Sequence, residues 1–252
     1  MRLSRQDEAS ECRSRKAPGS SVCAQSRVCS IQGHPLFKNV RVEVWRRFHL
    51  SVTAHAHRAG DKLFYQGNPP LGVYFICAGR VKLVQEGPGG RSQIVRIVKA
   101  PDLLGERAFI AEAPYACTAE VMEPAHILFM EAGAFWSLFG ENAQLLRGIA
   151  RRLALALGRS EAYMNCLASC TVTGRMAAHL LSSRTNSPKA RTPGCEFTLT
   201  ESRMELAEVL GTSPEAVSRS LSELRAKGLL AVKGRTIRIL QEAGLRRVSC
   251  LP

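Results

Sequence analysis

Three polar side chains near the C-terminus have the types and spacing needed to read DNA bases. Glu215, Ser218 and Arg219 lie three and four residues apart, so a helix would carry them on one side. The planar fork of Arg219 matches the N7 and O6 acceptors of guanine, and the Glu215 carboxylate can accept from the cytosine amino group. Ser213 and Ser222 add hydroxyls that can reach phosphates or base edges. The alternative is a surface ion pair between Glu215 and Arg219 that only supports the helix.

The surrounding residues predict two short helices joined by a tight turn over residues 199–230. Gly211 follows the first apolar stripe directly, where a left-handed residue ends a helix. Thr212 or Ser213 can cap the second helix, and Pro214 suits its first turn. Such a pair is typical of the helix-turn-helix, whose second helix enters the major groove. The residues expected to be buried are Leu206, Val209, Leu210, Val217, Leu221, Leu224 and Leu230.

A basic β-hairpin is predicted directly after these helices, over residues 231–240. Two β-prone runs flank Lys233-Gly234, a pair typical of tight turns. Lys233, Arg235 and Arg238 would stay outside and contact phosphate, as in the wing of a winged helix-turn-helix. Residues 171–252 hold 13 Lys or Arg against 7 Asp or Glu. Such a basic surface is typical of DNA-binding domains.

The composition limits the class of protein. The chain has 252 residues, a formal charge of +14 and 45% hydrophobic residues, which allows two domains with real cores. No apolar run approaches the ~20 residues of a membrane span, and the polar first 30 residues do not resemble a signal peptide. We therefore expect a cytoplasmic protein with no membrane partner. Its nine cysteines are then expected to be thiols, metal ligands or packed side chains.

The sequence texture divides the chain into four parts and predicts an α+β fold. Residues 1–34 form a polar segment that contains Cys12, Cys23 and Cys29. Residues 35–133 begin with a short amphipathic helix over 35–50 and continue as short strands separated by Gly-rich turns, which is typical of a sandwich or barrel. Residues 134–170 return to helical spacing. Residues 171–252 form the predicted DNA-binding domain.

The helix over 134–170 carries apolar residues at alternating spacings of three and four. This seam runs for about three heptads, as in a two-stranded coiled coil. The alternative is one long core helix of a monomer, but a helix-turn-helix that reads a twofold site needs a partner. We therefore expect a homodimer. Its predicted interface residues are Leu146, Ile149, Leu153, Ala156, Ser160, Tyr163 and Leu167.

The order of β-roll, long helix and winged helix-turn-helix resembles the Crp/Fnr family of bacterial transcription regulators from about residue 35 to 240. The most specific stretches are AGDKLFYQGNPPLGVYFICAGRVKLV, VTGRMAAHLL and the segment from Glu205 to Ile239. The recognition helix matches the E-x-x-S-R pattern of the Fnr branch at Glu215–Arg219. The resemblance implies a cyclic-nucleotide-binding-like β-roll, a palindromic Fnr-like DNA site with TTGAT-type half-sites, and contact with RNA polymerase.

The same resemblance raises three possible signals, of which the first is a cyclic nucleotide. Members that bind cAMP hold its phosphate with a Gly-Glu pair followed by an Arg-Ser pair. Gly105-Glu106 is present, but Tyr115-Ala116 stands where the Arg-Ser pair is expected. A phosphate needs a cation, and the nearby Arg107 would supply one only if it pointed toward the phosphate. We therefore expect cAMP binding to be less favoured than the other signals.

The second possible signal is oxygen or redox state, sensed by an iron–sulfur cluster. A cluster needs four thiolate ligands, and oxygen-sensing Fnr proteins place three in the N-terminal segment and one in the β-roll. Cys12, Cys23, Cys29 and Cys117 match that count. Their spacing is wider than in Fnr, so the alternative is a tail whose cysteines bind nothing. We favour oxygen or redox among the three signals.

Haem is the third possible signal, with His55, His57, His126 or Cys77 as the axial ligand. We rank it below the cluster because two histidines that alternate on one strand face are more often surface residues.

An enzyme is not expected, because the chain contains no GxGxxG, GxxxxGK[ST], HExxH or GxSxG motif. A structural DNA-binding protein remains the alternative outside regulation, although it would not need the β-roll.

Overall fold

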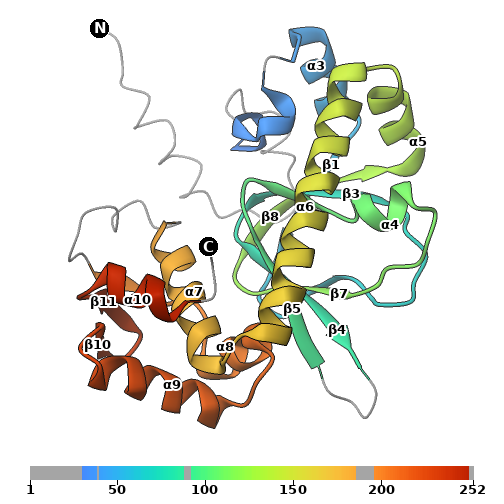
Figure 1. Cartoon of the computed structure of the whole chain (residues 1–252). Coiled ribbons are helices and arrows are strands. Elements are labelled where there is room, and N and C mark those ends of the chain that lie inside the picture. Colours follow the sequence, from blue (N-terminus) through green and yellow to red (C-terminus); the bar gives the residue numbers. More distant parts are fainter. Residues whose placement is uncertain (1–29, 39, 88–91, 186–195, 250–252) are drawn as a thin grey trace, which may run out of the picture. The chain divides into compact units, whose positions relative to one another are not determined.

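The computed structural model describes residues 30–38, 40–87, 92–185 and 196–249. The chain forms two compact units that divide between Ala154 and Leu155, and each is described by itself (Figure 1). Cys12, Cys23 and Cys29 lie outside the described residues.

The N-terminal unit opens with two 3-10 turns and one helix. They are η1 (Ser30–Gly33), η2 (Pro35–Phe37) and α3 (Val42–Leu50). The continuous helix expected over 35–50 is therefore divided in two, because Lys38 and Arg41 both adopt extended backbone angles. Phe37 and Phe48 are nevertheless both buried in one core cluster, so both parts of this amphipathic segment pack inward.

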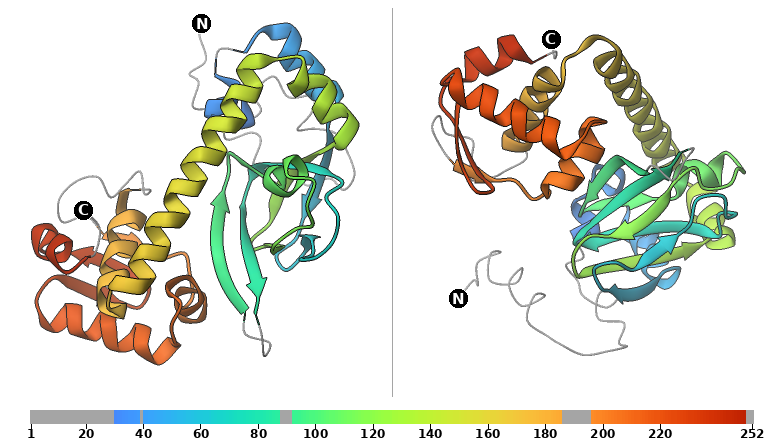
Figure 2. Two further views of the ribbon diagram at one scale, coloured as in Figure 1. Left: turned by 45° about the vertical axis from the view of Figure 1, so that its right-hand side comes forward. Right: turned by 90° about the horizontal axis from the view of Figure 1, so that it is seen from below.

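Eight strands then form the β-roll as two antiparallel four-stranded sheets. Their orders are β1-β8-β3-β6 and β2-β7-β4-β5. Figure 2 shows β4 and β5 as a long hairpin of this roll. The short helix α4 (Glu106–Ile110) lies between β6 and β7 in the chain. The strands are β1 (Thr53–His57), β2 (Lys62–Phe64), β3 (Gly72–Ala78), β4 (Arg80–Glu86), β5 (Ser92–Lys99), β6 (Asp102–Leu104), β7 (Thr118–Val121) and β8 (Ala125–Glu131).

The first of these sheets is covered on both faces. Ile76 and Ile127 point into a core cluster that also contains residues of the second sheet. Phe75 and Leu128 belong to a different cluster, together with residues of the helices. Because successive side chains of a strand point to opposite faces, β3 is buried on both sides. This explains why its sequence, GVYFICA, is almost continuously apolar.

Three helical segments follow the roll: α5 (Ala132–Phe135), a π-helical turn η4 (Trp136–Gly140) and α6 (Ala143–Ser169). The helix expected over 134–170 is thus interrupted before α6. The Asn142 side chain accepts hydrogen bonds from the backbone N–H groups of Gln144 and Leu145, at 3.1 and 3.2 Å. An N-cap of this kind starts a new helix.

The C-terminal unit is a winged helix-turn-helix. Its sheet has the strand order β10-β11-β9, and one apolar cluster joins that sheet to its helices. The predicted fold class, a β-roll, a long helix and a winged helix-turn-helix, is confirmed. The elements are α7 (Val172–Thr185), β9 (Glu196–Thr198), α8 (Arg203–Leu210), α9 (Pro214–Ala226), β10 (Leu230–Lys233), β11 (Thr236–Ile239) and α10 (Glu242–Val248).

Candidate functional site

The turn between α8 and α9 is fixed by local hydrogen bonds. Ser202 and Glu205 form a reciprocal capping box at the start of α8. Gly211 ends α8 with a φ of 61°, a left-handed conformation that glycine adopts without steric cost. The Ser213 side chain then accepts from the N–H of Ala216 at 3.3 Å and starts α9, with Pro214 in the first turn. The sequence predicted the Gly211 stop, and of the two predicted caps, Thr212 or Ser213, the structure uses Ser213.

Helix α9 separates a buried stripe from an exposed polar face. Val217, Leu221 and Leu224 are at most 4% exposed, so the helix is held by its apolar side. On the other side lie all five residues predicted to contact DNA from this helix: Ser213, Glu215, Ser218, Arg219 and Ser222 are exposed. The structure thus places these five residues on one accessible surface, as DNA contact requires.

Glu215 and Arg219 do not form a tight surface pair. Among the described ion pairs, none joins them. The pKa of Glu215 is lowered first by a hydrogen bond with Ser213 and then by its own backbone N–H, and the charge of Arg219 contributes least. The expected ion pair is therefore absent among the described residues, and Glu215 is instead bonded at the start of α9.

The β10–β11 hairpin forms the expected wing (Figure 1). Lys233 pairs with Thr236 across the turn, and Gly234 supplies a positive φ. Lys233, Arg235 and Arg238 are all exposed. The wing therefore presents cations beside the helix-turn-helix, where a phosphate backbone could be contacted.

The Gly105-Glu106 pair in the β-roll is engaged by an arginine of the same chain. Glu106 is 6% exposed, and its Oε1 accepts from the Nε of Arg152 at 2.9 Å. The same guanidinium donates to Asp102 and, at 2.7 Å, to the carbonyl of Leu103. Arg152 belongs to α6, so this fork ties the long helix to the Gly105-Glu106 pair.

Asp102 is the centre of that network. Its Oδ2 lies 3.2 Å from Arg96, and its Oδ1 lies 3.4 Å from Nε2 of His34. Burial alone would raise the pKa of Asp102, but the hydrogen bond with His34 and the charges of Arg152 and Arg96 outweigh it and lower the pKa. Two carboxylates thus face two guanidiniums in this network.

Tyr115, one of the two residues expected in place of an Arg-Ser pair, lies in an aromatic stack. Tyr115 is 5% exposed, and its ring stacks on Phe64 with centroids 3.8 Å apart. Its hydroxyl lies 3.5 Å from the carbonyl of Gly72, and burial raises its pKa. The Tyr115 side chain, which carries no charge for a phosphate, therefore fills buried space in the β-roll.

The described residues do not assemble a metal site. No group of three or more His, Cys, Asp or Glu side chains within residues 30–249, masked gaps excepted, is arranged to hold a metal. Cys117 is buried, and burial raises the pKa of its thiol, with a smaller opposing effect from Arg107. His55 and His126 are exposed, whereas His57 is half-buried. Cys77 is packed in the core.

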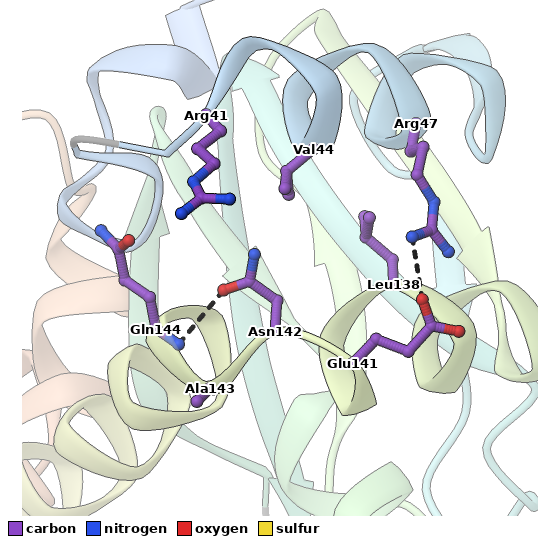
Figure 3. Close-up of a pocket in the computed structure, with 8 residues that line it drawn as sticks. All are labelled: Arg41, Val44, Arg47, Leu138, Glu141, Asn142, Ala143 and Gln144. Atoms are coloured by element: carbon purple, nitrogen blue, oxygen red, sulfur yellow. Dashed lines mark hydrogen bonds and ion pairs between the residues drawn. The ribbon is translucent and has the colours of Figure 1, made fainter.

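A surface hollow of about 390 Å³ lies between α3 and the start of α6 (Figure 3). Arg47 and Glu141 form an ion pair of 2.9 Å on one side of it, and the Asn142 cap lies opposite Arg41. None of the residues predicted to take part in signalling lines this hollow. It is therefore separate from the Gly105-Glu106 site.

Helix α6 carries two apolar faces. Of the predicted interface residues, Ile149 is 3% exposed inside the core of its own β-roll, and Leu146 and Leu153 pack against that core. Tyr163 donates a hydrogen bond to α8 of the same chain. Ala156 and Leu167 are half-buried, and Ser160 is exposed. A second set with the same alternating spacing is entirely exposed: Ala150, Ala154, Leu157, Glu161, Met164 and Ala168.

Comparisons with known proteins agree with this architecture. Residues 55–142 match the cyclic nucleotide-binding domain, and residues 174–248 match the Crp-like helix-turn-helix domain. A "CRP-like cAMP-activated global transcriptional regulator" of Mycobacterium tuberculosis is 24% identical over 75% of this chain and 84% of its own length. The "Transcriptional regulator LdrP" of Thermus thermophilus is 29% identical over 74% and 92%.

A solved structure shows the same fold. FixK2 from Bradyrhizobium japonicum superposes with a TM-score of 0.70 and 23% identity, covering 80% of this chain and 98% of FixK2. Among the described residues, no helix is long and apolar enough to span a membrane.

Proposed function

Because the chain belongs to the Crp/Fnr family of DNA-binding transcription regulators, we propose that it is a homodimer that binds a specific palindromic DNA site through α9. The observation that carries the proposal is the exposed face of that helix, with Glu215, Ser218 and Arg219 accessible above a buried stripe. No described ion pair joins Glu215 to Arg219, so the Arg219 guanidinium is not committed to that carboxylate.

The proposed half-site is of the TTGAT kind. Arg219 would donate to the N7 and O6 atoms of its guanine, and Glu215 would accept from the amino group of the cytosine on the other strand. Ser213, Ser222, Lys233 and Arg235 would contact phosphates or base edges and hold the helix in register. RNA polymerase is the proposed partner for the regulatory step.

The proposed dimer uses the exposed face of α6. Leu157 and Met164 are 61% and 60% exposed, although both are large apolar residues. They belong to a set, with Ala150, Ala154, Glu161 and Ala168, whose spacing alternates between four and three residues. This spacing matches a two-stranded seam, and the exposed face takes the place of the one expected from sequence alone.

We propose that cAMP is not the signal for this chain, although the Mycobacterium tuberculosis relative is named as cAMP-activated. Glu106 and Asp102 already neutralise Arg152 and Arg96, and the Tyr115 ring occupies buried space against Phe64. A cyclic phosphate would meet two carboxylates and would have no uncommitted cation among these residues.

An oxygen or redox signal remains a proposal that rests on Cys12, Cys23, Cys29 and Cys117. The described residues fit a cluster poorly, because the Cys117 thiol is buried and burial disfavours its thiolate. The test is an absorption spectrum with iron and sulfide analysis on protein purified without oxygen. A broad visible band that bleaches in air supports a cluster, a sharp Soret band indicates haem, and a colourless protein that binds DNA contradicts both.

The proposed function is tested by titrating the full chain onto a palindromic TTGAT-type duplex and onto a scrambled duplex of equal length. We expect specific binding at least ~10³-fold tighter than binding to the scrambled duplex, with no change when cAMP is added. Equal affinity for both duplexes would contradict sequence-specific reading. Tighter binding with cAMP would contradict our interpretation of the Glu106 site.

A further inference from the structure

A hydroxyl group on the long helix contacts the helix-turn-helix. The Tyr163 Oη, on α6, donates a hydrogen bond of 2.8 Å to the carbonyl of Val209 in α8. Both residues lie in the C-terminal unit. The bond therefore connects the helix of the proposed dimer interface to the first helix of the DNA-binding motif.

The acceptor is one of the carbonyls that a helix end leaves without an intrahelical partner. In α8 the carbonyl of Ala207 accepts from the backbone N–H of Thr212, and that of Glu208 accepts from the N–H of Gly211. The next carbonyl, that of Val209, accepts from Tyr163. The hydroxyl thus adds a hydrogen bond to the C-terminal end of α8, two residues before the Gly211 turn that leads into α9.

A second set of contacts reaches α9 through α7. The Arg175 guanidinium donates to the carbonyls of Leu167 and Cys170, at 3.4 and 3.0 Å, and so holds the start of α7 on the end of α6. Thr173 in turn donates to the Glu223 carboxylate of α9 at 2.7 Å. With Tyr163 on α8, both helices of the motif are tied to α6.

Tyr163 points to a different side of α6 from the exposed seam. Glu161 and Met164 flank it in sequence and are exposed, whereas Tyr163 is half-buried. Successive residues of a helix are turned by 100°, so Met164 can contact a second copy of the chain while Tyr163 contacts α8 of its own chain. The direction of each α8–α9 pair is then set relative to the dimer axis.

We infer that Tyr163 is a positioning residue for DNA recognition, which fixes the spacing of the two recognition helices rather than their contacts with bases. The inference rests on the proposed dimer and deepens it. Recognition helices must meet half-sites about one DNA turn, ~34 Å, apart. A single added base pair moves a half-site by ~3.4 Å and turns it by ~35°, so a rigidly held motif discriminates sharply against it.

The test compares the wild-type chain with Tyr163→Phe, which removes only the hydroxyl, and Tyr163→Leu, which also removes the ring. Tyr65→Phe, at an exposed tyrosine of the β-roll, is the matched control. Each protein is titrated onto palindromic duplexes whose half-site spacing is optimal, one base pair shorter or one base pair longer, and onto a single half-site. Thermal melting verifies that each variant is folded.

We expect both Tyr163 variants to reduce the ratio of Kd values between altered and optimal spacing by ~2- to 10-fold, the range of one hydrogen bond. Affinity for a single half-site should stay that of the wild type, as should every value for Tyr65→Phe. The inference is overturned if Tyr163→Phe discriminates between spacings as well as the wild type does. This holds even if Tyr163→Leu loses discrimination, because the hydroxyl would then not be responsible. A wild-type chain that is indifferent to spacing instead overturns the proposed dimeric reading.

Discussion

The Nε atom of Arg152 lies 2.9 Å from Oε1 of Glu106, although the two residues are 46 positions apart in the chain. The Arg152 side chain is 11% exposed and that of Glu106 is 7% exposed. An arginine of α6 therefore binds the glutamate of the Gly105-Glu106 pair and connects the β-roll to its long helix.

Replacing Arg152 by Met should destabilise the β-roll strongly, because it leaves the carboxylates of Glu106 and Asp102 buried without their main partner. Breaking a buried pair typically costs ~3–5 kcal/mol of unfolding free energy. Arg151→Met, at the exposed neighbouring position, is the control and should cost less than ~0.5 kcal/mol. Denaturant unfolding of both variants measures the difference, and equal stabilities would contradict the assigned role of the network.

The stability of the N-terminal unit should depend on the ionisation of Asp102. Its pKa is lowered in the folded chain, so its stabilising effect is present above the unfolded value of ~3.9. That effect is lost as the pH falls through the folded pKa. Asp102→Asn should therefore be less stable than wild type at neutral pH, with a difference that shrinks below pH ~4.

The measurement is urea unfolding between pH 3 and 7, which lie on either side of ~3.9. Glu112→Gln, at an exposed carboxylate, serves as the matched control and should follow the wild-type curve. A wild-type advantage over Asp102→Asn that stays constant across this range would show that charge at Asp102 does not stabilise the fold.

A charge placed on one face of α6 should affect the proposed dimer differently from a charge placed on the other face. Leu157→Asp replaces a large apolar side chain of the exposed seam with a charge and should convert the proposed dimer into monomers, because an ionised carboxylate would have to be buried without a partner. Ser160→Asp places the same charge on the seam expected from sequence alone, and should leave the dimer intact. Sedimentation velocity measures both. Dissociation by Ser160→Asp but not by Leu157→Asp would favour the original seam.

The sequence predicted the DNA-binding unit well because its signals are local. Gly211 and Pro214 mark the ends of α8 and α9, and Lys233-Gly234 marks the wing turn, all through backbone preferences of single residues. These preferences act within a few positions, so no knowledge of tertiary packing was needed.

The faces of α6 could not be assigned from sequence for the opposite reason. Both Ile149 and Leu157 belong to stripes with heptad-like spacing, and periodicity alone does not tell which stripe meets the chain's own core. The partners of Arg152 were likewise hidden, because Asp102 and Glu106 lie 50 and 46 residues away. Only the packing of α6 on the β-roll buries Ile149 and brings these charges together.

Single-base substitution of the half-site tests most directly whether α9 reads bases through Arg219. The affinities of the wild type, Arg219→Ala and Arg225→Ala are measured on a palindromic duplex and on each single-base variant of its half-sites. Arg225 is an exposed arginine in the last turn of the same helix, and serves as the matched control.

Arg219→Ala should lose ~1–3 kcal/mol of discrimination at one guanine position and keep it elsewhere, while Arg225→Ala keeps the wild-type pattern at every position. An Arg219→Ala protein that is weakened evenly on all duplexes, specific and scrambled alike, would contradict base reading by this helix.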